Sequence, residues 1–80
     1  MFVVVRGKAD RMHEVAAYLY AGQTIVSEPV ANEFGSMMLI VESAHGLAGR
    51  MLADRLGSGM FGAKEFETRT EAEDWIESER

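Results

Sequence analysis

The residues whose types could support chemistry lie together between positions 42 and 52, where the sequence reads ESAHGLAGRML. This stretch contains Ser43, which a kinase could phosphorylate, His45, which is one of only two histidines, and the cation Arg50. A histidine can act as a general base or a metal ligand, and an arginine can contact a partner. The stretch also follows an apolar run and contains two glycines, so the start of a helix explains it equally well.

Ser43 stands where the apolar run should pass into the next helix. As the N-cap residue, its hydroxyl would accept a hydrogen bond from a helix amide that has no partner within the helix. We favour this structural interpretation. It predicts that Ser43→Asp is nearly neutral, because aspartate also caps helices and suits the helix dipole.

His45 lacks the partners that catalysis or metal binding requires. The other histidine, His13, belongs to a different predicted helix, and the chain has no cysteine. Two histidines form a metal site only where carboxylates converge on them in space. The sequence contains no nucleophile paired with a base, no paired acids at defined spacing and no metal motif. We therefore expect no catalytic residue, no metal, no cofactor and no enzymatic activity.

Two tyrosines offer a second set of contact residues. Tyr18 and Tyr20 flank Leu19, and they should therefore point to different sides of the first predicted helix. A tyrosine combines a large apolar ring with a polar tip, which suits both partial burial and a contact surface.

Composition restricts the class of protein. A chain of 80 residues, with 48% hydrophobic and 26% charged residues, forms one small α/β domain over residues 1–80. A net charge of −5 argues against nucleic acid as a partner. No apolar run approaches the ~20 residues that span a bilayer, and there is no signal-peptide pattern. Without cysteines, the chain is compatible with a reducing cytoplasm, and we expect a cytoplasmic protein.

Apolar spacing predicts three strands alternating with three helices. The strands are expected at residues 2–5, buried on both faces, at 36–41 in the middle of the sheet, and at 60–67 with an edge-like face. The apolar stripes expected for the three helices are, in order, Met12, Val15, Ala16 and Leu19; Leu47, Met51, Leu52 and Leu56; and Ala72, Trp75 and Ile76. The expected caps are Asp10 for the first helix and a capping box from Thr70 to Glu73 for the last, with a turn at residues 57–59.

Residues 23–35 decide between two folds. A strand at 24–26, paired with the strand at 36–41, would give the order βαββαβ of a ferredoxin-like fold, followed by an extra C-terminal helix. A short helix capped by Ser27, with Pro29 in its first turn, would leave three long parallel strands in an open sheet. Periodicity does not separate the two.

The C-terminal half carries a family resemblance. The run MMLIVESAHGLAGRML, followed by FETRTEAEDWI, resembles the end of small bacterial STAS-type domains of the SpoIIAA-like group, with Phe66, Ala72 and Trp75 at matching positions. The resemblance implies a small open α/β sheet covered by helices, of order βα(β)βαβα, and a non-enzymatic regulatory module. It also implies that Ser43 lies where such proteins carry a regulatory serine, whose phosphate would block docking of a partner.

Two functions from different classes follow. The first is a non-enzymatic, STAS-like module that docks a protein partner or a second copy of itself. The alternative is a ferredoxin-like dimer of the dimeric α/β-barrel type, which binds a small molecule between sheet faces and can carry minor enzymatic activity. A strand within residues 23–35 favours the alternative, and a helix or loop favours the module. We favour the module, and we expect a homodimer formed through the first helix, the first strand or both.

Overall fold

The computed structural model describes residues 1–57 and 61–80. Along the chain it contains five strands, one 3₁₀-helix (η1) and two α-helices: β1 Phe2–Lys8, η1 Ala9–Tyr18, β2 Gln23–Ile25, β3 Val30–Ala31, β4 Ser36–Ser43, α1 Gly46–Gly57, β5 Gly62–Phe66 and α2 Arg69–Glu79. Most of the chain is therefore regular structure, as the alternating apolar patterns predict.

The five strands form one antiparallel sheet. Its order is β2-β4-β1-β5, and β3 pairs with the same edge of β4 as β2 does. Of the two folds left open by residues 23–35, the one with three parallel strands is therefore wrong, and the STAS-like order is not confirmed. A strand does form within residues 23–35, and β4 lies inside the sheet as expected. The first strand is buried on both faces, as predicted, because β1 lies between β4 and β5 and helices cover both sides.

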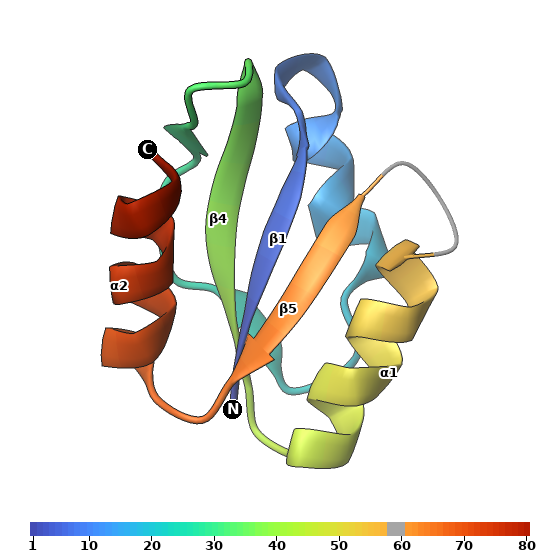
Figure 1. The fold of residues 1–80 in the computed structure, drawn as a ribbon. Helices are drawn as coiled ribbons and strands as arrows, with labels where there is room; N and C mark the ends of the chain where they lie inside the picture. The colour runs from blue at the N-terminus through green and yellow to red at the C-terminus, as the bar shows by residue number, and fades with distance from the viewer. Residues whose placement is uncertain (58–60) are drawn as a thin grey trace.

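Helices lie on both faces of the sheet, as Figure 1 shows, with η1 and α1 on one side and α2 on the other. Alternate residues of each strand point to opposite faces, so the sheet supplies two separate apolar clusters. The first cluster contains Val3, Val5, Met12, Val15, Leu39, Val41, Leu52, Leu56 and Phe61. The second contains Val4, Met38, Ile40, Ala72 and Ile76, with Phe66 and Trp75 packed against it.

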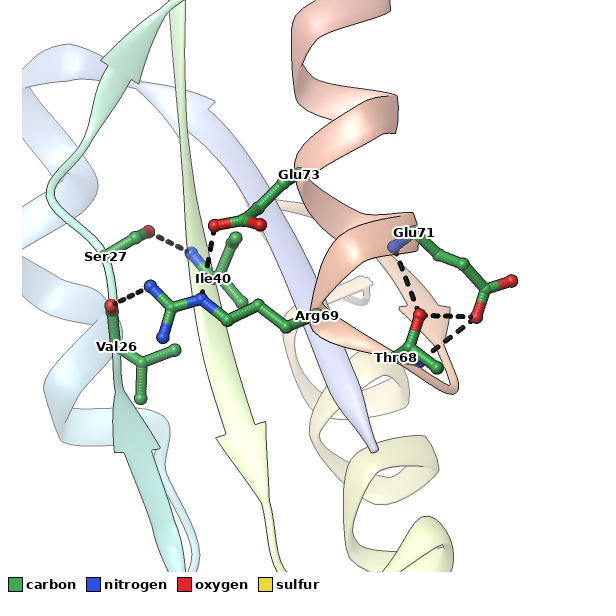
Figure 2. A network of polar contacts seen from close by, with 7 residues as sticks. All are labelled: Val26, Ser27, Ile40, Thr68, Arg69, Glu71 and Glu73. Atoms are coloured by element: carbon green, nitrogen blue, oxygen red, sulfur yellow. Dashed lines mark hydrogen bonds and ion pairs between the residues drawn. The ribbon is translucent and has the colours of Figure 1, made fainter.

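Helix α2 is held to the second face by polar contacts at its first turn (Figure 2). A capping box fixes its start, but it joins Thr68 to Glu71 rather than Thr70 to Glu73, because Thr68 is the last extended residue before the helix. Arg69 reaches across the sheet, where its Nη2 donates to the carbonyl of Val26 at 3.0 Å, and its Nε pairs with Glu73 at 3.3 Å. The bond to Val26 connects the first turn of α2 to the residue that follows β2.

The edge formed by β2 and β3 is interrupted between Ile25 and Val30. Ile25 pairs with Val41 and Val30 pairs with Met38, so four residues of the edge lie opposite only two residues of β4. The extra residues form a bulge in the edge. Within the bulge, the Ser27 hydroxyl accepts the hydrogen bond from the amide of Ile40 at 2.8 Å (Figure 2). Pro29, which cannot donate to a ladder, lies in the same gap. Ser27 therefore completes the sheet and does not cap a short helix.

The first helix has 3₁₀ geometry, and this changes which side chains it buries. With three residues per turn, Met12, Val15 and Tyr18 share one face, and the first two are fully buried. Ala16, which a period of 3.6 predicts to be buried, is exposed. The residue before the helix is Lys8, with no side-chain cap, so the predicted cap at Asp10 is wrong.

The third predicted strand, at residues 60–67, is confirmed over β5. Its expected start at Met60, and the turn expected at residues 57–59 beyond Gly57, lie outside the described residues. In the part of the chain that the structure covers, no helix is both long and apolar enough to cross a membrane.

Candidate functional site

Ser43 ends β4 as a buried residue, with only 2% of its surface exposed. Its hydroxyl donates to the carbonyl of His45 at 2.9 Å and accepts from Nε2 of Gln23 at 3.2 Å. Neither partner is an amide of α1, so the expected N-cap role is wrong. The hydroxyl instead bonds to the same His45 carbonyl that accepts the helix bond from the amide of Gly49.

Gln23 is the centre of this buried network. Its Oε1 accepts from the amide of Tyr20 at 2.8 Å, and its Nε2 donates to the carbonyl of Ala48 at 2.8 Å as well as to Ser43. One side chain therefore joins the end of the η1 loop, the end of β4 and the first turn of α1. Buried polar groups of this kind stabilise a fold only when every one has a partner.

His45 and Arg50 are both exposed, and the structure does not bring them to a shared catalytic cluster. The other histidine, His13, lies on η1, away from the start of α1. Across residues 1–57 and 61–80, no group of three or more acidic or histidine side chains is arranged to hold a metal ion.

The two tyrosines are part of the domain rather than of an open surface. Tyr18 is partly buried with its ring edge-on to Phe61, at 5.9 Å between ring centroids. The guanidinium of Arg55 lies 4.7 Å from the ring centroid of Tyr20, and its Nη1 donates to the carbonyl of Tyr18. Both tyrosines therefore fasten α1 to the end of η1.

Helix α1 buries a different stripe from the predicted one. Leu52 and Leu56 are buried as expected, together with Gly49, but Leu47 is 72% exposed and Met51 is 43% exposed. A Cβ at position 49 would stand 2.7 Å from Cγ of Met1, so the absence of a side chain there lets α1 approach the start of β1. The helix is rotated so that the glycine faces the sheet, and this rotation turns the two other apolar side chains outward.

The outward face of α1 is a stripe of four residues: Leu47, Arg50, Met51 and Asp54. They are spaced i, i+3, i+4 and i+7, so they line one side of the helix. The side chains of Arg50 and Asp54 form no hydrogen bond or ion pair with any residue that the structure describes. The α1 stripe thus presents two large apolar side chains beside one cation and one anion.

The described residues line surface cavities that have the size of small-ligand sites. One, of about 530 Å³, lies between η1 and the interrupted edge and has a mostly apolar lining that includes Met12, Met37 and Pro29. Another, of about 310 Å³, lies between α2 and the interrupted edge, with Ser27 and Glu73 in its lining. A cavity of about 300 Å³ lies on the second face and is lined by Val4, Arg6, Gly62, Ala63, Lys64 and Trp75. Their volumes fall at the lower end of the range of ligand pockets.

Compared with models of protein families, with curated proteins and with solved structures, the chain has no significant match. The resemblance to STAS-type domains therefore stays a prediction.

Two features of this region are not predicted by the sequence reasoning. The exposed pair Leu47 and Met51 was assigned to the core, and Gln23 was not recognised as a buried polar residue. The spacing of Gly49, Leu52 and Leu56, which is i, i+3 and i+7, indicates the buried side of the helix and therefore the exposure of Leu47 and Met51. The burial of Gln23 depends on two partners, Ser43 and Ala48, that lie 20 and 25 residues further along the chain, and its one near partner is the backbone amide of Tyr20.

Proposed function

We propose that this chain is a non-enzymatic protein-binding module, and that the partner it docks is a second copy of itself. The observation that supports the proposal is the α1 stripe, where two large apolar side chains one turn apart face solvent. Exposed apolar contacts of this kind, flanked by polar residues, are typical of protein interfaces. Homodimers with two-fold symmetry are the commonest soluble oligomers.

The charges of the stripe favour a second copy over an unrelated partner. In a two-fold interface, residue i of one subunit contacts residue j of the other, and the reverse contact forms by symmetry. Two antiparallel α1 helices would place Arg50 beside Asp54 of the partner subunit twice. The two Met51 side chains would then meet near the axis. The stripe is therefore complementary to itself in both charge and apolarity.

For the fold, we propose the ferredoxin-like βαββαβ order with an additional C-terminal helix. The antiparallel order β2-β4-β1-β5 and the strand at Gln23–Ile25 support this assignment. The same strand favours the small-molecule alternative of the dimeric α/β-barrel type. That alternative, however, needs a sheet face that is free to meet a second sheet. Here α2 covers the face opposite η1 and α1, and Arg69 fastens it to the edge strand.

The burial of Ser43 argues against regulation by phosphorylation at that residue. Only 2% of the Ser43 surface is exposed, and its hydroxyl already donates to the carbonyl of His45, so a kinase would have to open the domain to reach it. Docking through the α1 stripe requires no such opening of the domain.

The measurement that tests self-docking is the molar mass by light scattering across a hundredfold range of protein concentration. We expect the mass of the parent chain to rise from one copy to two. Leu47→Glu should shift this transition to at least about tenfold higher concentration, because each subunit then brings one carboxylate into an apolar contact. Phe34→Glu is the matched control, since Phe34 is equally exposed, at 75%, but lies in the turn before β4.

A charge exchange distinguishes this geometry from other dimers. Arg50→Asp alone places like charges opposite each other and should weaken the dimer. Adding Asp54→Arg restores opposite charges and should restore the parent transition. A constant monomer mass for the parent, or a double variant as weak as the single one, would contradict the proposed docking.

A further inference from the structure

The cavity on the second face of the sheet combines two cations with an apolar wall. It lies between α2 and the strands β1 and β5, with a volume of about 300 Å³. We propose that this cavity binds a small organic anion, a carboxylate carried on an apolar or aromatic body. Trp75 of α2 lines the cavity, and α2 lies on the side of the sheet opposite α1 (Figure 1), so binding there does not depend on the proposed dimer.

The sheet register places the two cations as neighbours. Arg6 of β1 is directly opposite Gly62 of β5, and Val4 is opposite Lys64, so both charged side chains leave the same face on adjacent strands. Like charges in this arrangement repel each other, and an anion between them removes the repulsion. In a chain with a net charge of −5, such a local excess of positive charge is a distinct feature.

The domain itself neutralises these cations only in part. Arg6 has one carboxylate neighbour, Glu79, with 3.9 Å between Nη1 and Oε1, and its side chain stays 45% exposed. Among the described residues, Lys64 has no carboxylate within ion-pair distance. Its Nζ lies instead 5.4 Å and 5.6 Å from the ring centroids of Trp75 and Phe66. Both ammonium and guanidinium groups therefore keep donors available for an incoming carboxylate.

The remaining lining defines the body of the ligand. Val4 is a fully buried apolar floor, and Trp75 provides a partly buried aromatic wall that packs against Phe66. Gly62 has no side chain, so the space opposite Arg6 stays open. A Cβ at this position would be 4.0 Å from Nε of Arg6. A planar apolar group fits this space, with its carboxylate directed at the two cations.

Trp75 is the only tryptophan of the chain, so its fluorescence reports directly on the cavity. The experiment titrates the protein with benzoate as the probe, and with benzamide as the neutral molecule of the same shape. We expect a saturable change in Trp75 emission with benzoate and none with benzamide. Inorganic phosphate, which has charge but no apolar body, should compete at least about tenfold more weakly than benzoate.

Four variants test the residues. Arg6→Gln and Lys64→Gln should each weaken benzoate binding about tenfold or more, since each removes one charged donor. Gly62→Val should abolish binding by filling the cavity, and valine is well tolerated in strands. Glu79→Gln should strengthen binding, because it removes the carboxylate that competes for Arg6.

Arg11→Gln is the matched control, because it changes the net charge equally on η1, on the opposite side of the sheet, and it should leave benzoate binding unchanged. Thermal melts check that each variant is folded, and the use of four variants keeps the test informative if one of them unfolds. The proposal is overturned if benzoate causes no saturable change at tens of millimolar, if benzamide binds equally well, or if Arg11→Gln weakens binding as much as Lys64→Gln does.

Discussion

Ser43→Asp should destabilise the domain by about 3–5 kcal/mol, because it places a carboxylate at a buried position whose hydrogen-bond partners among the described residues are neutral. The side chain is buried, and its neighbour across the network, Gln23, can donate only one hydrogen bond to it. The carbonyl of His45, which now accepts from the hydroxyl, would face a negative charge instead. A loss of this size is a large part of the stability of a small domain. Urea denaturation followed by circular dichroism measures it.

Two neighbouring variants separate the buried charge from other effects. Ser43→Ala should cost about 1–2 kcal/mol, because one hydrogen of the Gln23 amide loses its partner while the other keeps Ala48. Ala44→Asp introduces the same charge one residue later, at an exposed position before α1, and should be nearly neutral. If Ser43→Asp proved as stable as Ala44→Asp, the hydroxyl would be accessible, and the capping interpretation would return.

The sheet was largely predictable because its signals are local. The apolar run at residues 2–5 predicts a strand buried on both faces, the run at 36–41 predicts a strand in the middle of the sheet, and both lie inside the sheet. The direction and order of the strands were not predictable in the same way. They depend on whether residues 23–35 pair with β4, and that pairing is completed by the single hydroxyl of Ser27, which sequence reasoning also accepts as a helix cap.

The first helix shows a second limit of local patterns. The period of 3.6 predicts burial of Ala16, whereas the observed period of three turns Tyr18 towards Phe61. Both periods bury Met12 and Val15, so the apolar residues alone do not distinguish them. Because Tyr18 packs against Phe61, its ring is partly buried and is not available as the contact residue that the sequence suggested.

The candidate sites depend on contacts between distant parts of the chain. Arg6 and Lys64 are 58 positions apart, and only the register of β1 with β5 makes them neighbours. Glu79, near the end of the acidic helix α2, likewise approaches Arg6 only because the fold brings α2 against β1. The stretch around Ser43, by contrast, has the residue types of a chemical site, but the Ser43 hydroxyl and the His45 carbonyl form hydrogen bonds that hold the start of α1 in place.

The last prediction compares two leucines of α1 that the sequence placed on one buried stripe. Leu52 is fully buried in the first core cluster, so Leu52→Ala should lower the free energy of unfolding by about 2–5 kcal/mol, through lost apolar burial and the cavity left behind.

Leu47→Ala removes the same atoms from a side chain that is 72% exposed, and it should change stability by less than about 0.5 kcal/mol. Both variants are to be unfolded in urea at a low protein concentration, where self-association contributes little. Equal losses at the two positions would mean that the Leu47 side chain is buried in the domain as deeply as that of Leu52. In that case the α1 stripe would not be free to dock a second copy, since its apolar residues would already belong to the core.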